Sequence, residues 1–298
     1  MDKKTLFGEE YSHLVPLLLC KKTRGQVHSI FTNGFNIIMG DSLVFIGNRK
    51  NGLLPFGIHL REMDTSRAVA AVNNGDSVFW NIKTESLEFP RITIRLNKGK
   101  SFKNELAELK ETKIFEASFE RLFTQLVGIE ERTGLDVDIQ LFLEKWNERS
   151  GQTWTDTETF IIMLIEAATS SDEHSIEKAL RYFLGRGQGL TPSGDDMVVG
   201  LLAFDAVSHF IFAPFYQKLS KLLGEPITTD VGREYLRYAL EHEFSSTVSK
   251  MVNALVIERD SDFKEVFGNL LGVGHSSGMD TLFGILIGML AYKNFYRE

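Results

Sequence analysis

Two copies of the pattern SGxDxxxG constrain the fold of this chain more than any other feature. They occupy residues 193–200 and 277–284, and an apolar run follows the aspartate of each copy. The matched positions are Ser193, Gly194, Asp196 and Gly200 in the first copy and Ser277, Gly278, Asp280 and Gly284 in the second. The apolar runs predict two buried helices, and the glycine one turn after each aspartate allows two helix backbones to pack closely. We therefore predict that the helices cross at Gly200 and Gly284 and that their N-termini meet at one polar pocket.

The first copy ends a glycine-rich loop, GRGQGLTPSGDD, at residues 185–196. Glycines at alternate positions free this backbone to adopt φ > 0 or to approach a ligand. Ser193 followed by Asp196 fits a capping box, and the repeat predicts Asp280 as the capping carboxylate of the second helix. Helix N-termini offer unpaired N–H groups and a partial positive charge, so the loop indicates a phosphate or carboxylate site. Two unrelated capped helices without a ligand remain the alternative.

The candidate site combines hydrogen-bond donors with two residues placed near the chemistry. The residues predicted to hold an anion are Gly187, Gly189, Thr191, Ser193, Gly194, Ser276 and Ser277. Arg186 is the nearest cation and a candidate bidentate partner for a carboxylate. Asp195 points about 100° away from Asp196 on a helix, so we expect it to be the freer carboxylate. His275 directly precedes the second helix, where an imidazole can accept a proton near neutral pH.

No cofactor is predicted. The seven histidines show neither HxxxH nor HxH spacing, which disfavours a zinc site. Mg²⁺ at Asp195 stays open as an alternative, because hard cations prefer carboxylate oxygens.

The blocks GxGxGLTPSGDD and GxSSGxD resemble the bacterial family, long described as a domain of unknown function, that includes the AllH subunit of oxamate carbamoyltransferase. The resemblance implies a subunit of a multi-protein enzyme of allantoin and purine breakdown, which exchanges a carbamoyl group between oxamate and phosphate. Two other functions stay open. One is a non-catalytic scaffold or regulatory subunit, and the other is a Mg²⁺-dependent enzyme acting on a phosphate or ureide compound.

Charge and composition limit the partners. The net charge of −7 argues against nucleic-acid binding, which needs clustered Lys and Arg. The apolar run TLFGILIGMLAY has twelve residues, whereas a membrane-spanning helix needs about twenty. Cys20 is the single cysteine, so an internal disulfide is excluded, and the N-terminal residues lack the apolar core of a signal peptide. We expect a cytoplasmic protein that binds a small anionic substrate and other subunits, but no nucleic acid or membrane.

The predicted fold class is α+β with two domains. Residues 1–99 are expected to form an antiparallel β sandwich or partly closed barrel, because strand-like runs fill residues 25–97 and a hairpin signal lies at Asn33 and Gly34. Residues 100–298 are expected to form a mainly helical domain carrying both helix starts. Its first helix is predicted over 101–127, and Thr155 with Glu158 predicts a capping box.

Overall fold

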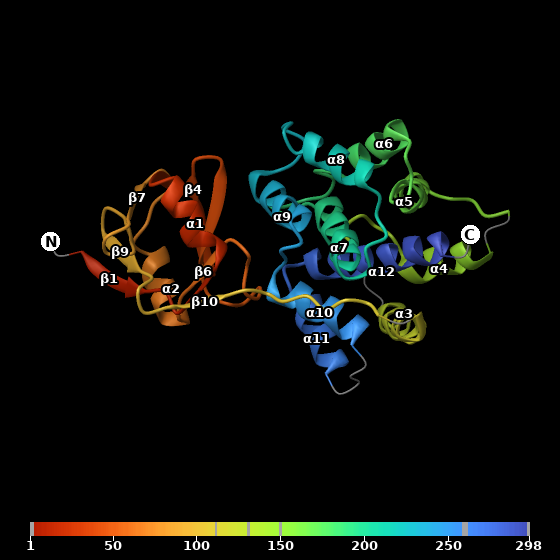
Figure 1. Cartoon of the computed structure of the whole chain (residues 1–298), viewed down its shortest axis with the longest axis horizontal. Coiled ribbons are helices and arrows are strands. Elements are labelled where there is room, and N and C mark those ends of the chain that lie inside the picture. Colours follow the sequence, from red (N-terminus) through yellow and green to blue (C-terminus); the bar gives the residue numbers. More distant parts are fainter. Residues whose placement is uncertain (1–2, 111, 130–131, 149–150, 258–261, 297–298) are drawn as a thin grey trace. The chain divides into compact units, whose positions relative to one another are not determined.

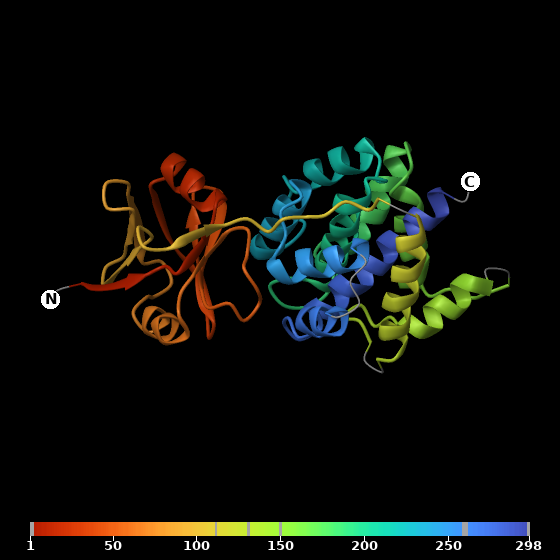
Figure 2. The same cartoon turned by 60° about the horizontal axis from the view of Figure 1, so that its bottom comes forward.

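The computed structural model describes residues 3–110, 112–129, 132–148, 151–257 and 262–296. The chain divides into two compact units, Met1–Glu105 and Leu106–Glu298 (Figures 1 and 2). Each unit has its own hydrophobic core. The α+β class is therefore confirmed, with strands in the first unit and helices in the second.

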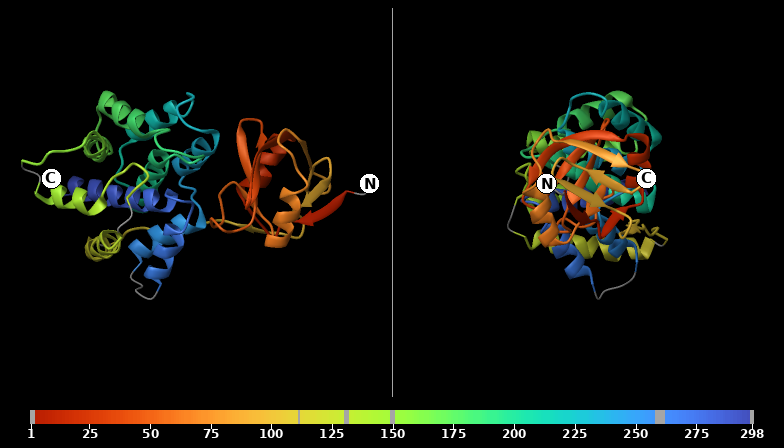
Figure 3. Two further views of the ribbon diagram at one scale, coloured as in Figure 1. Left: turned by 180° about the vertical axis from the view of Figure 1, so that it is seen from behind. Right: turned by 90° about the vertical axis from the view of Figure 1, so that its left-hand side faces the viewer.

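The first unit is built on one curled sheet, a half-barrel, whose strands are visible in Figure 3. Its strands, in the described residues, are β1 (Lys4–Phe7), β2 (Glu10–Ser12), β3 (Arg24–Phe31), β4 (Gly34–Met39), β5 (Ser42–Gly47), β6 (Gly57–His59), β7 (Ser77–Asn81), β8 (Ser86–Glu88), β9 (Ile92–Arg95) and β10 (Lys100–Phe102). The spatial order is β1-β9-β8-β7-β3-β4-β5-β6-β2-β10. The predicted hairpin forms between β3 and β4, where Phe31 pairs with Gly34. Helices α1 (Leu14–Lys21) and α2 (Glu62–Val69) belong to this unit, and Val15, Leu19 and Ala68 join its core.

The sheet is mixed, so the predicted antiparallel arrangement is wrong in part. The pairs β1–β9, β5–β6 and β2–β10 are parallel, and the other neighbours are antiparallel. β1 and β10 lie at the two edges and pair with strands remote in the sequence. Local alternation of apolar residues carries no information about such pairing.

The second unit contains the helices α3 (Thr112–Val127), α4 (Ile139–Glu148), α5 (Asp156–Ala167), α6 (Glu173–Phe183), α7 (Ser193–Ser208), α8 (Ala213–Leu222), α9 (Asp230–Leu240), α10 (Ser246–Val256), α11 (Phe263–Leu271) and α12 (Ser277–Phe295). The helix predicted over 101–127 is wrong at its start, because Lys100–Phe102 is strand β10 and pairs with β2. The capping box of Thr155 and Glu158 is confirmed at the start of α5. In the described part of the chain, no helix has both the length and the apolar character needed to cross a membrane.

Helices α7 and α12 form the centre of the second unit, and Figure 1 labels both. Residues 193–207 of α7 and 278–291 of α12 are buried. A Cβ atom at Gly200 would lie 2.1 Å from the Thr281 carbonyl oxygen, and one at Gly284 would lie 2.0 Å from the Met197 carbonyl oxygen. Such distances are impossible, so only glycine permits this approach. The predicted crossing at Gly200 and Gly284 is confirmed.

Candidate functional site

The crossing brings the N-termini of α7 and α12 together. The hydroxyl of Thr191, two residues before α7, lies 3.0 Å from that of Ser277, the first residue of α12. The loop residue Gly134 lies against both helix starts, because a Cβ there would be 2.0 Å from Ser193 Oγ and 2.7 Å from Ser276 Oγ. The hydroxyl groups at the start of α7 and those at the start of α12 therefore lie together, although the two segments are distant in the sequence.

The two motif aspartates do not cap their own helices, so this prediction is wrong. The N-cap residue of α7 is Pro192 and that of α12 is Ser276, and neither side chain caps its helix. Asp196 and Asp280 each lie in the fourth position of the helix, one turn inside it, beside hydroxyls of the opposite helix start. Ser277 lies beside Asp196, and Ser193 lies beside Asp280. This reciprocal arrangement follows from the crossing and not from the local sequence.

Asp196 and Asp280 form a buried carboxyl pair, with 7% and 1% of their surfaces exposed. Burial raises the pKa of Asp196 well above its usual value, and the charges of Asp280 and Asp195 raise it further, against the effect of the Ser277 and Thr191 hydroxyls. Burial also raises the pKa of Asp280, against the effects of Ser193, the Gly134 N–H and Ser276. Burial and the proximity of the two groups therefore disfavour ionisation of both carboxyls together.

One oxygen of each carboxyl has no hydrogen-bond partner. Asp280 Oδ1 accepts a hydrogen bond of 2.8 Å from the Gly134 N–H. In contrast, Oδ2 of Asp280 and Oδ2 of Asp196 are buried without a hydrogen-bond partner among the described residues. The neighbouring serine hydroxyls lower the pKa values but do not satisfy these two atoms. Because buried polar atoms are almost always paired in proteins, these two oxygens are available to accept hydrogen bonds from a bound group.

Asp195 has a different role from the one predicted. Its Oδ1 accepts a 2.8 Å hydrogen bond from the Gly185 N–H, and its Oδ2 accepts one from the Thr228 hydroxyl. Burial raises the pKa of Asp195 to about 6, although both hydrogen bonds and the charge of Arg233 act in the opposite direction. Both oxygens are occupied, so the expectation that Asp195 is the freer carboxylate is wrong. Asp195 instead fixes the beginning of the glycine loop.

The glycine loop is held close to the α7 N-terminus. The hydroxyl of Thr229 donates to the Leu190 carbonyl, and the Gly194 N–H donates to the Arg186 carbonyl. Gly187 has φ of +116°, and a Cβ there would lie 2.6 Å from the backbone nitrogen of Ser193. The loop backbone therefore lies directly against Ser193. By contrast, a Cβ at Gly189 would meet no atom within 4 Å.

Arg186 and His275 are both exposed. The Arg186 guanidinium packs 3.8 Å from the centre of the Tyr182 ring, and its Nε donates to the Tyr182 carbonyl. The other face of the ring stacks on Phe160, with 3.8 Å between ring centres. His275 lies in the turn before α12. The described contacts do not link either side chain to Asp196 or Asp280.

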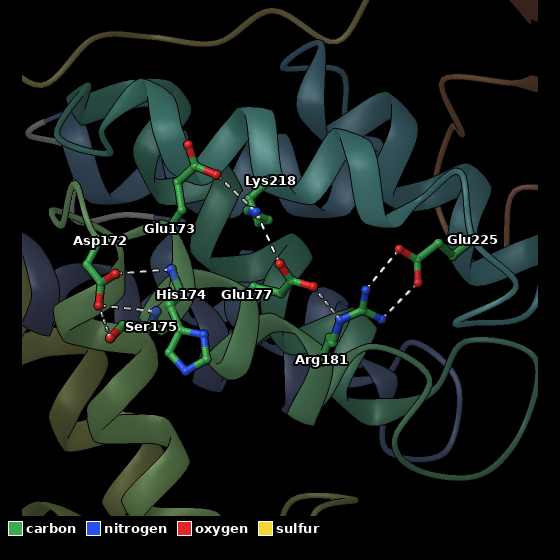
Figure 4. Close-up of polar contacts among 8 residues, drawn as sticks. All are labelled: Asp172, Glu173, His174, Ser175, Glu177, Arg181, Lys218 and Glu225. Carbon is green, nitrogen blue, oxygen red and sulfur yellow. Dashed lines mark hydrogen bonds and ion pairs between the residues drawn. The ribbon is translucent and has the colours of Figure 1, made fainter.

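A network of ion pairs joins α6 to Lys218 of α8 and to Glu225, which follows α8 (Figure 4). Arg181 pairs with Glu225 and Glu177, both at 2.8 Å, while Lys218 lies 3.1 Å from Glu177 and from Glu173. The same helix face and Arg186 line a surface pocket of about 570 Å³. Since carboxylates match the charges of Arg181 and Lys218, neither side chain is a free cation for a ligand.

Two residues of the site were not predicted from the sequence. Gly134 lies in the loop before α4, and a single glycine in a polar loop gives no signal of its position. Tyr235 lies on α9, and its pKa is raised by burial and by the charge of Asp196. Its helix is amphipathic, which predicts burial but not this neighbour. Among the described residues, no three or more His, Cys, Asp or Glu side chains form a group able to hold a metal ion.

Two family models match the chain. The model described as oxamate carbamoyltransferase subunit AllH matches residues 183–289, which include both glycine-bearing loops, helix α7 and most of helix α12. The model described as the AllH family N-terminal domain matches residues 6–101, which cover nearly all of the curled sheet. No solved structure matches the chain.

Proposed function

The chain belongs to the AllH family, and on this premise we propose that it is a subunit of a carbamoyltransferase that binds a small anion where α7 and α12 begin. The anion is carbamoyl phosphate, phosphate or oxamate, and the enzyme acts in allantoin and purine degradation in the bacterial cytoplasm. Other subunits complete the enzyme.

One observation carries this proposal: Thr191, Ser193, Ser276 and Ser277 are gathered at two joined helix N-termini. Hydroxyls donate hydrogen bonds to phosphate and carboxylate oxygens, and the helix dipoles favour negative charge there. The raised pKa values of Asp196 and Asp280 weaken the repulsion that two ionised carboxylates would exert on an anion.

The carbamoyl transfer requires hydrogen-bond donors and a base. In the transfer, the amide nitrogen of oxamate attacks the carbonyl carbon of carbamoyl phosphate, a C–N bond forms, and the C–O bond to phosphate breaks. Phosphate leaves with the electron pair, and the nitrogen loses a proton to a base. Hydroxyl and N–H donors stabilise the negative charge on the carbonyl and phosphate oxygens. We assign the base to His275, the exposed imidazole next to α12, and the grip on the oxamate carboxylate to Arg186.

Calorimetry with carbamoyl phosphate, phosphate and oxamate tests the proposal, on the chain alone and with the proteins that co-purify with it. We expect binding in at least one format. Ser193→Ala and Ser277→Ala should each weaken phosphate binding about tenfold, the effect of losing one hydrogen bond to a charged group. Ser208→Ala is the matched control, because Ser208 lies at the opposite end of α7 and its hydroxyl donates to the Phe204 carbonyl.

Two results would contradict the proposal. Absence of binding in both formats would discredit it and favour a scaffold subunit. Altered assembly in Ser193→Ala and Ser277→Ala, with unchanged ligand affinity, would point to the same alternative.

A further inference from the structure

The two unpartnered oxygens, Oδ2 of Asp196 and Oδ2 of Asp280, call for a hydrogen-bond donor or a cation. A carboxyl oxygen accepts hydrogen bonds in either protonation state. A protonated carboxyl could donate its one O–H to an anion. With at least one carboxyl of the pair ionised, however, one Oδ2 can be satisfied only by a donor, and phosphate and carboxylate oxygens only accept. A group that pairs with these oxygens therefore differs in chemistry from the anion that the hydroxyls bind.

The structure already shows a suitable donor at this pair. The backbone amide of Gly134 donates to Oδ1 of Asp280 at 2.8 Å, and the donor is a planar amide N–H. A primary amide, NH₂, offers two such N–H groups on one nitrogen, and the pair has two free oxygens. The charge of Asp195 also acts on Asp196, which favours a donor at this pair.

We propose that Asp196 and Asp280 together bind the NH₂ group of the ligand, and that they select carbamoyl and carboxamide compounds over analogues carrying a methyl group in its place. The inference rests on the proposed function, since it assumes that Ser193, Ser276 and Ser277 hold the phosphate of carbamoyl phosphate and that Arg186 holds the carboxylate of oxamate. Asp196 and Asp280 are then specificity-determining residues, and their motif positions serve recognition and not helix capping.

Isosteric ligand pairs test this selection. Carbamoyl phosphate and acetyl phosphate differ by NH₂ against CH₃, and so do oxamate and pyruvate. Calorimetry on the full chain, with its co-purifying partners where these are required, should show each amide binding at least about 100-fold more tightly than its methyl analogue. Loss of a hydrogen-bonding group leaves buried acceptors unpaired, which is why the preference is large.

Substitutions of the two aspartates test whether they cause the preference for amide over methyl ligands. Asp196→Asn and Asp280→Asn preserve shape but replace one acceptor oxygen by a donor NH₂, so each should reduce the preference at least about tenfold while phosphate affinity changes little. Asp205→Asn is the matched control. Asp205 is also buried in α7, but its oxygens already accept from the Phe210 and Ile211 N–H groups and from Tyr216.

The outcomes separate the two proposals. Equal affinities of wild-type protein for amide and methyl ligands would overturn the selection by Asp196 and Asp280 and leave anion binding intact. Absence of binding of every ligand, phosphate included, would overturn the proposed function and the selection with it.

Titrations with EDTA and with MgCl₂ test whether the two oxygens hold a cation instead. Binding that requires Mg²⁺ in wild type but not in Asp196→Asn would show that the oxygens hold a cation, which also overturns the selection. If an Asn variant fails to fold, the wild-type comparison alone still decides.

Discussion

Gly200 and Gly284 touch through their backbones where α7 and α12 cross. A Cβ at Gly200 would lie 3.0 Å from the carbonyl carbon of Gly284, and closer still to the Thr281 carbonyl oxygen. Because both helices are buried along most of their length, neither can move away without opening the core. The closeness of this crossing sets the distance between Ser193 and Ser277, and so sets the geometry of the site.

Gly200→Ala and Gly284→Ala should therefore each lower the free energy of unfolding by about 1–3 kcal/mol, the usual cost of overpacking a core. Chemical denaturation measures the change. Gly268→Ala in α11 is the control, since a Cβ there would meet nothing within 4 Å. It should stabilise the protein by up to about 1 kcal/mol through helix propensity. If the crossing variants were as stable as Gly268→Ala, the close approach would be wrong.

The free energy of unfolding should depend on pH through Asp195, and its pKa fixes the sign of the change. Its pKa is about 6 in the folded protein against 3.8 when exposed. A raised carboxyl pKa means that the folded state binds the proton more tightly. The stabilisation is therefore complete below about pH 4 and is lost as pH rises through 6, by roughly 3 kcal/mol in total. Asp195→Asn has no such titration. Its unfolding free energy relative to wild type should increase between pH 4 and 7, whereas parallel pH profiles would contradict the assignment.

The sequence predicted those parts of the structure that depend on local patterns. The β3–β4 hairpin, the Thr155 capping box and the α7–α12 crossing each have a signal within a few residues. The crossing is a special case, because the same local signal occurs twice and the two copies are complementary.

The partners of the aspartates could not be predicted in this way. Asp195 is held by Thr228, which is 33 residues away, and Asp280 by Gly134, which is 146 residues away. Only the tertiary fold determines which of two adjacent carboxylates has a free oxygen. The edge strands β1 and β10 were missed for the same reason, since each owes its pairing to a segment distant in the chain.

Arg186 should contribute to the affinity for a carboxylate ligand. Stacking on Tyr182 and the Nε hydrogen bond restrict the side chain, which leaves its two terminal NH₂ groups as donors. Arg186→Gln should lower oxamate affinity at least about tenfold in calorimetry, and Arg186→Lys should restore only part of it, because lysine lacks the planar fork. Arg181→Gln is the control, since Glu177 and Glu225 already occupy that guanidinium. Equal losses in both variants would indicate a general charge effect instead of a specific contact.

His275 is expected to act in the chemical step and not in binding. It is exposed at the turn before α12, next to the hydroxyls of Ser276 and Ser277 that we assign to the anion. Removal of a general base typically costs about 10²–10⁴-fold in rate, so His275→Gln should lower kcat of the assembled enzyme in that range with little change in KM. His174→Gln provides the comparison, since His174 is also exposed but lies on α6 in the network of Figure 4. A normal kcat in His275→Gln would assign the proton transfer to another group, and the pair of Asp196 and Asp280 would be the next to test.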